Sequence, residues 1–467
     1  MLLSYRLSAR SLTGAPDMTQ HKPQFSYELS ALESIAADVL ARAKSQGASA
    51  CEMEVSEGFG QSVTVRRNEV ENIEYNRDKG MGVTVYVGKK KGHANTSDFS
   101  PQALRDSVDK AITIARFTAS DDCAGLADAE LMAPPGAQRE LDLFHPWNLP
   151  VDEAIELARQ CEAAAFRLDP RITNSEGASV ACHQSQFIIA NSHGFMAGFP
   201  TSRHYISCAV IASEDGAMQR DDWYASQRAA ADLASPAAVG DYAGRRALAR
   251  LRGRKISTMQ VPVLFEAPVA GGLISHFVSA VTGGSLYRKS TFLLDSIGKA
   301  VFSPMVNLRE RPFVARGQAS SWFDDDGVAT RERDVVRAGE VQGYFLGSYS
   351  ARKLGMQTTG NSGGNYNLVL DPGPQDLQGL IRQMGRGLLV TELMGQGINI
   401  VTGDYSRGAA GYWVEGGEIQ YPVEEITIAG NLRDIFRGIV GIGNDVLVRG
   451  SKLNGSILVD RMTIAGN

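Results

Sequence analysis

The amino-acid sequence predicts an α+β protein in which two N-terminal α+β units precede a β-rich C-terminal domain with a twisted or barrel-like sheet. Three observations support this prediction. The 467 residues are too many for one ordinary hydrophobic core. The 49 glycines, with only 7% aromatic residues, favour short strands joined by tight turns over helical bundles. From Ile256 onward, strand-like segments recur with few helical patterns between them.

The first predicted unit covers residues 18–120 and begins with an amphipathic helix. Apolar residues recur at helical spacing over residues 30–45. Ser30 and Glu33 have the spacing of a capping box, and Gly47 stands where a C-terminal cap belongs. We therefore expect a helix that begins at Ser30 and ends just before Gly47.

Strands and a second helix complete this unit. Alternating apolar residues predict three separate strands at residues 51–55, 61–67 and 82–87, with Gly, Asn and Asp in the turns. Ser100 and Pro101 then predict a helix start, with Ser as the N-cap and Pro at the first helical position.

The second predicted unit covers residues 121–255. Its first part, residues 121–150, has the composition of a linker, and a helix is expected from Asp152 to Phe166. Residues 171–226 alternate strand patterns with turn signals, and the Ala-rich residues 229–252 predict another helix.

The C-terminal domain is predicted over residues 256–467. A buried strand is expected at residues 261–265 and a helix at residues 271–281. At the other end of the chain, residues 1–17 lack the continuous apolar stretch of a signal peptide. We expect them to be disordered or to reflect an over-called translation start.

Charge and cysteine usage exclude several classes of protein. The net charge of −5 and the absence of a basic stripe argue against nucleic-acid binding. No run of 18 apolar residues is present, which argues against a transmembrane helix. The five cysteines are scattered and unpaired in pattern, which is typical of reduced thiols, so we expect a cytoplasmic protein.

Ordered motifs run through the C-terminal domain and carry a family resemblance. They are Ser285–Ser290, Phe292–Lys299, Asp324–Val328, Gly343–Tyr344, Thr359–Asn361, Val401–Ala409, Gly411–Glu415, Tyr421–Asn431 and Met462–Asn467. In these segments the chain resembles the TldD/PmbA metalloprotease family (peptidase U62 type). The Gly403–Gly408 block and the terminal Ala-Gly-Asn are similar to the PmbA branch, also called TldE.

The resemblance implies a zinc site in the TldD-type subunit, built from a His-Glu-x-x-x-His helix and a cysteine. Zinc prefers nitrogen and sulfur ligands, with one open position for water and a nearby carboxylate as base. In this chain the matching helix is 271–280, where the two ligand positions fall on Ser275 and Ala280 and the base position falls on His276. No cysteine follows Cys208. We therefore expect no catalytic zinc in this chain.

Six residues are candidates for lining a substrate channel. They are Arg288, Thr359, Gly360, Asn361, Asp404 and Arg407. The loop at 359–365 has the glycines of a phosphate-binding loop but lacks its Gly-Lys-Ser/Thr ending. Asp404 and Arg407 could form a buried ion pair or contact a partner chain, and both interpretations remain open. Asp324–Asp326 lacks EF-hand spacing, so an acidic turn is favoured over a cation site.

Other histidine chemistry is less favoured by the sequence. Ser275 and His276 are neighbours on a helix and point about 100° apart, which argues against a hydrogen-bonded nucleophile pair. His183, His193 and His204 lie on predicted strands, well separated in the chain. A structural role is therefore expected for His276, and surface or hydrogen-bonding roles are expected for His183, His193 and His204.

These inferences lead to one leading hypothesis and two alternatives. The chain is expected to be a non-catalytic PmbA/TldE-like subunit that binds a TldD-type zinc subunit, encloses a channel and assists proteolysis of unfolded or modified peptides. It would hold no cofactor itself, zinc would reside in the partner, and a homodimer is also possible. The alternatives are a self-standing metallopeptidase with an unrecognised site, and a regulatory binding protein like a gyrase modulator.

Overall fold

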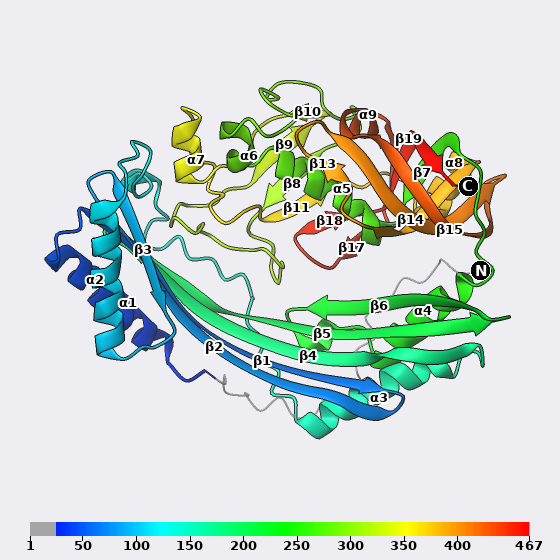
Figure 1. The fold of residues 1–467 in the computed structure, drawn as a ribbon, viewed down its shortest axis with the longest axis horizontal. Coiled ribbons are helices and arrows are strands. Elements are labelled where there is room, and N and C mark those ends of the chain that lie inside the picture. The colour runs from blue at the N-terminus through cyan, green and yellow to red at the C-terminus, as the bar shows by residue number, and fades with distance from the viewer. Residues whose placement is uncertain (1–24, 467) are drawn as a thin grey trace.

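A long curved sheet with a β-rich domain on its inner face makes up the protein (Figure 1). The computed structural model describes residues 25–466. The expectation for residues 1–17 therefore falls outside the described residues. Among residues 25–466, no helix is long and apolar enough to cross a membrane.

The two N-terminal units share one six-stranded antiparallel sheet. Its strands, in spatial order, are β3 (Lys90–Thr96), β2 (Glu69–Val87), β1 (Ala50–Arg66), β4 (Ile172–Asn191), β5 (Met196–Glu214) and β6 (Ala217–Gln227). The two units join where β1 pairs with β4, from Glu52 opposite Asn191 to Val65 opposite Ala178. The first and second α+β units are therefore halves of one continuous sheet.

The strands of this sheet are longer than the sequence pattern predicted. The expected separate strands at 51–55 and 61–67 are one strand, β1, of 17 residues. That prediction was wrong because Gly58 and Gly60 lie inside the strand rather than in a turn. The reversal occurs instead at Arg67 and Asn68, which have positive φ angles of 51° and 65°.

Four helices cover the outer face of the sheet in two pairs (Figure 1). They are α1 (Leu29–Ser45) and α2 (Pro101–Phe117) at one end, and α3 (Val151–Phe166) and α4 (Pro236–Ala249) at the other, with short 3-10 turns at Ala129–Leu131 and Ala230–Asp232. Each pair packs its small and aliphatic residues on the buried side of the strands beneath it, which gives two separate hydrophobic cores.

The helix starts test the capping predictions directly. Ser100 accepts a hydrogen bond from the Ala103 N–H, so the predicted cap is confirmed. The Ser30 capping box is wrong, because α1 begins one residue earlier and Glu28 is its N-cap, without a side-chain hydrogen bond. The Ala-rich helix expected over 229–252 begins only at Pro236, where Ser235 supplies the cap.

The C-terminal domain contains two mixed sheets, which confirms the predicted fold class. The smaller has the order β10 (Glu340–Val341), β9 (Arg333–Arg337), β8 (Leu308–Arg311), β11 (Asn367–Leu370), β18 (Lys452–Asn454) and β17 (Leu447–Val448). The larger has the order β12 (Gly387–Met394), β7 (Met259–Phe265), β19 (Ile457–Ala465), β15 (Glu418–Asn431), β14 (Asp404–Glu415) and β13 (Ile398–Asn399), with β16 (Ile439–Ile442) on β19. Because β12 also pairs with β14, the larger sheet closes into a barrel.

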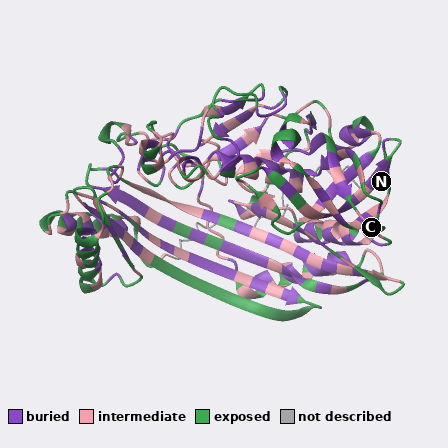
Figure 2. Ribbon diagram, turned by 45° about the horizontal axis from the view of Figure 1, so that its top comes forward, coloured by how far each residue is buried: buried purple, intermediate pink, exposed green. Residues whose placement is uncertain are grey.

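Five further helices belong to this domain. They are α5 (Ala267–Ala280), α6 (Gly283–Tyr287), α7 (Ser348–Lys353), α8 (Leu377–Met384) and α9 (Leu432–Arg437). In the long N-terminal sheet, buried residues alternate along the strands with partly exposed ones (Figure 2). The inner face of this sheet faces the C-terminal domain, so its partly exposed residues border any space between the sheet and that domain.

Candidate functional site

Helix α5 contains Ser275, His276 and Ala280, the positions that the family resemblance aligned with the zinc-binding pattern. It follows strand β7 directly, and its buried residues include Leu273, Ile274, Phe277 and Val278. These residues join the main core of the C-terminal domain. The spacing of three and four residues places one face of α5 in the core and fixes the direction of the remaining side chains.

The two positions expected to carry zinc ligands have local structural roles. The Ser275 hydroxyl donates a hydrogen bond of 3.0 Å to the carbonyl of Gly271 in the preceding turn. Ala280 is fully buried in the core and has only a methyl group. Neither side chain is available as a nitrogen or sulfur ligand.

His276 lies against strand β14, beside a tyrosine and an arginine. The ring centroids of His276 and Tyr405 are 5.9 Å apart in an edge-on arrangement. Tyr405 and Arg407 are two residues apart on β14 and so project from the same face of the strand. Burial, with a smaller contribution from the Arg407 charge, lowers the pKa of His276 to about 4.

Tyr405 is the site residue that the sequence did not single out. Its side chain is buried, and its hydroxyl has no hydrogen-bond partner among the described residues. Burial raises its pKa to about 12, so the phenol stays protonated. The sequence shows that Tyr405 and Arg407 are two residues apart on one strand. The contact between Tyr405 and His276 could not be predicted, because it depends on how α5 packs on the barrel.

The side chains around α5 do not fit a zinc ion. One neutral imidazole is present where the resemblance implies two imidazoles, a carboxylate and a thiolate. The Arg407 guanidinium disfavours a proton on His276 and would oppose a divalent cation in the same place more strongly. Across residues 25–466, no group of three His, Cys, Asp or Glu side chains has an arrangement that could hold a metal.

Asn361 anchors the glycine-rich loop at residues 359–365 through hydrogen bonds of its own side chain. Its side-chain amide donates to Glu310 at 2.8 Å, and its oxygen accepts from Arg333 at 3.1 Å. Glu310 is 1% exposed and forms an ion pair of 2.7 Å with Arg333. Thr359 donates to the Asn361 oxygen at 2.8 Å, and Gly360 adopts a φ of +72° against the carbonyl of Ala329. In this structure Asn361 therefore holds the loop.

The remaining channel candidates do not come together. Asp404 and Arg407 are three residues apart on β14 and lie on opposite faces, so the suggested buried ion pair is wrong. Asp404 instead accepts hydrogen bonds from Thr402 at 2.6 Å and Asn431 at 3.2 Å. Arg288 is exposed after α6 and donates to the hydroxyl of its neighbour Tyr287.

The acidic run Asp324–Asp326 is a hydrogen-bonded turn that holds the glycine-rich loop. Asp324 accepts from the backbone N–H groups of Asp326, Val328 and Ser362. Asp326 accepts from the Ser348 N–H and the Ser362 hydroxyl, both at 2.9 Å. The carboxylate of Asp325 has no such hydrogen bond.

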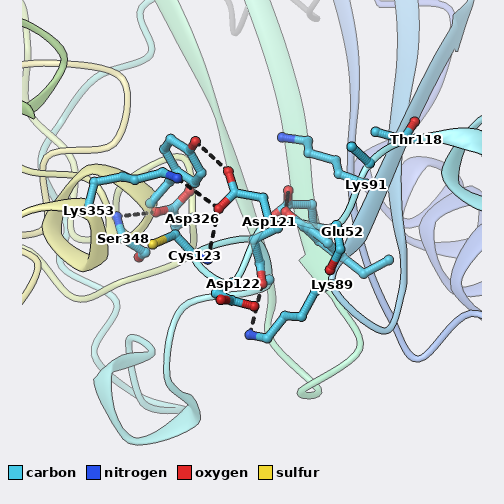
Figure 3. Close-up of a pocket in the computed structure, with 16 residues that line it drawn as sticks. Glu52, Lys89, Lys91, Thr118, Asp121, Asp122, Cys123, Asp326, Ser348 and Lys353 are labelled. Atoms are coloured by element: carbon cyan, nitrogen blue, oxygen red, sulfur yellow. Dashed lines mark hydrogen bonds and ion pairs between the residues drawn. The ribbon is translucent and has the colours of Figure 1, made fainter. Parts of the chain in front are cut away.

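A hollow of about 920 Å³ lies away from α5, between the first unit and helix α7 (Figure 3). Most of its charged groups are already paired. Lys353 contacts Asp121 at 2.8 Å, and Tyr86 donates to Glu52 at 2.8 Å. The Lys353–Asp121 pair connects the linker after α2 to the C-terminal domain, whereas the Tyr86–Glu52 hydrogen bond joins β2 to β1 within the first unit.

The three scattered histidines also lie apart from α5. His183 and His204 are on β4 and β5, and His193 is in the turn between these strands. His204 is fully buried and is hydrogen-bonded through Nε2 to the carbonyl of His145 at 2.7 Å. Burial lowers the pKa of His204 to about 4, and its hydrogen bond agrees with the expected hydrogen-bonding role.

Comparison with known proteins identifies the class to which this fold belongs. Three successive models of PmbA/TldA metallopeptidases match the chain: domain 1 at residues 51–115, the central domain at 144–251 and the C-terminal domain at 258–466. The chain is 50% identical over 427 residues to the metalloprotease PmbA of Escherichia coli O157:H7, covering 91% of this chain and 94% of that protein. The chain belongs to the PmbA/TldD metallopeptidase family, in its PmbA branch.

Solved structures have the same fold. The crystal structure of a proposed modulator of DNA gyrase from Bacteroides thetaiotaomicron is 25% identical, with a TM-score of 0.88 over 93% of this chain and 99% of that one. TldE from Thermococcus kodakarensis is 18% identical, with a TM-score of 0.77 over 92% of this chain and 100% of that one. The latter likeness concerns the fold alone.

Proposed function

We propose that this chain is the non-catalytic subunit of a two-chain metallopeptidase in which a TldD-type partner holds the zinc. The observation that supports this proposal most directly is the set of side chains at the ligand positions. Ser275 is hydrogen-bonded to its own helix, and Ala280 is packed in the core. A duplicated fold can lose its metal in one copy while the surface that pairs the two copies is retained.

In this proposal the complex acts in the cytoplasm on unfolded or modified peptides, and this chain shapes the space that they enter. The inner face of the long sheet and the loops at residues 319–325 and 359–366 would form its wall. All five cysteines are free, which suits a reducing compartment.

The test is reconstitution from separately purified chains. Zinc content and cleavage of a flexible peptide are measured for this chain, for a TldD-type chain and for the two together. We expect zinc to accompany the partner, and cleavage to require the partner and to increase when this chain is added. Undiminished cleavage by the partner alone would contradict the proposed role.

The alternatives predict different outcomes. Stoichiometric zinc with chelator-sensitive cleavage by the isolated chain would indicate a self-standing metallopeptidase. Binding of purified DNA gyrase in the absence of the partner would indicate a regulatory protein.

A matched variant separates these cases further. His276→Asn retains a polar side chain of similar shape, and in the proposed complex it should leave the cleavage rate within about twofold. If His276 were a general base, the rate should fall at least about a hundredfold.

A further inference from the structure

A small hollow of about 200 Å³ lies between the inner face of the long sheet and the C-terminal domain. Its floor is formed by Phe187 and Ile189 of β4 and Phe199 of β5, and Phe187 is directly opposite Phe199 in the register. Its roof includes Tyr366 and Asp325 of the acidic turn. The volume is below the roughly 300 Å³ of small-molecule pockets, so it suits one side chain rather than a whole ligand.

Aromatic rings line this hollow from both domains. The centroids of Phe187 and Phe199 are 4.9 Å apart, and Phe323 of the C-terminal domain is 5.8 Å from Phe199 and 6.1 Å from Phe187. The faces of such rings carry negative potential and attract organic cations. The lining is therefore apolar, but the faces of its aromatic rings favour a positive charge.

Two carboxylates without a counter-ion lie at or beside the hollow. Asp325 lines it, whereas Glu54 does not line it but is opposite the lining residue Ile189 across the β1–β4 pair. Within residues 25–466, neither carboxylate forms an ion pair or a hydrogen bond, whereas the flanking Asp324 and Asp326 both do. Burial, followed by repulsion from the Glu54 carboxylate, raises the pKa of Asp325 to about 6. The negative charge at neutral pH is thus uncompensated.

We propose that this hollow receives the side chain of a lysine or arginine in a flexible peptide. The aliphatic stem would pack on Phe187 and Phe199, and the charged head would meet Asp325 and Glu54. A purely apolar side chain would desolvate these carboxylates without pairing them. An anion would be repelled. This inference rests on the peptide-handling role proposed above and adds a preference to it.

The test uses one labelled flexible peptide with a single variable position, bound to the chain in its purified complex. That position carries lysine, arginine, Nε-acetyl-lysine or norleucine, and affinity is measured by fluorescence anisotropy at pH 7.5. We expect the lysine and arginine peptides to bind about tenfold more tightly than the other two. Asp325→Asn, which preserves shape, should remove this preference, and Phe199→Leu should weaken it.

Asp38→Asn is the matched control, since Asp38 is exposed on α1 on the outer side of the sheet. It should leave all four affinities unchanged. Equal or tighter binding of norleucine, or an unchanged preference in Asp325→Asn, would overturn the cation site while leaving the peptide-handling role standing. Failure of all four peptides to bind would contradict both proposals.

Discussion

Arg246 of helix α4 forms a buried ion pair with Glu266, the residue that precedes helix α5. The distance from Nη1 to Oε2 is 3.0 Å, and the two side chains are 14% and 5% exposed. The same guanidinium contacts Asp221 of β6 at 3.0 Å. The second N-terminal unit is thereby attached to the start of the helix that carries His276.

Removal of this arginine should be strongly destabilising. Arg246→Met leaves Glu266 buried without its cation and leaves Asp221 with only a longer contact of 3.7 Å to Arg250, which should cost about 3–5 kcal/mol in the free energy of unfolding. Urea denaturation measures the loss. The adjacent Arg245 is the control, because its pair with Asp241 at 2.7 Å is exposed on one helix face. Arg245→Met should cost no more than about 0.5 kcal/mol, and equal losses for the two variants would contradict the importance of the buried network.

His276 should remain neutral well into the acid range. Burial and the Arg407 charge lower its pKa from 6.5 to about 4. Between these pH values the imidazole is protonated in the unfolded chain but neutral in the folded chain. Its contribution to stability is therefore complete above pH 6.5 and is lost as the pH falls toward 4. NMR titration of the imidazole signal measures the midpoint.

Arg407→Gln should move that midpoint upward but not to 6.5, because burial is the larger cause of the shift. Arg386, an exposed arginine elsewhere on the barrel, is the control position. A midpoint that responds equally to Arg386→Gln would show that the effect is not local.

Asn361 should affect stability more than substrate contact. Asn361→Ala removes the hydrogen bonds to Glu310 and Arg333, which should cost about 1–3 kcal/mol. Hydrogen exchange of residues 359–366 should accelerate. Asn72→Ala, at an exposed site on β2, is the matched control and should change neither quantity. Weaker peptide binding by Asn361→Ala with unchanged stability would instead assign Asn361 to the channel surface.

Asp325→Asn should stabilise the protein at neutral pH. The groups that face Asp325 are Glu54 of β1 and Asp326, with Tyr366 across the hollow, and none is a cation. Because the pKa is raised from 3.8 to about 6, the folded chain retains its proton longer, and stability declines as the pH rises between these values. The thermal midpoint of Asp325→Asn should exceed that of the parent protein at pH 7.5, and the difference should shrink toward pH 4. A constant difference, or one also given by Asp38→Asn, would contradict this account.

Local patterns in the sequence predicted the features that depend on neighbouring residues. Ser100 and Pro101 set the start of α2, and because the Ser100 cap lies within the first turn of that helix, local chemistry decides it. Ser275 and Ala280 were placed at the expected ligand positions of α5 by the family resemblance, not by local chemistry.

Features created by packing between distant segments could not be read in this way. Arg407 lies near His276 only because β14 passes beside α5, and Phe199 meets Phe323 only because the two domains face each other. The merging of two strands into β1 was missed for a related reason. Glycines signal turns in most sequences, yet Gly58 and Gly60 are held in extended backbone by pairing on both sides.

The pairing of β1 with β4 also governs how the chain can fold during synthesis. When β1 and β2 leave the ribosome, the partner of the second edge of β1 has not yet been translated, and that edge offers unsatisfied amide and carbonyl groups to any passing strand. Pairing β1 with β4 closes the long segment of chain between them. This step is slow, because the conformational entropy of that segment is lost before the contacts between the strands form. A nascent or truncated chain that ends before β4 is therefore the form most exposed to aggregation and most dependent on chaperones.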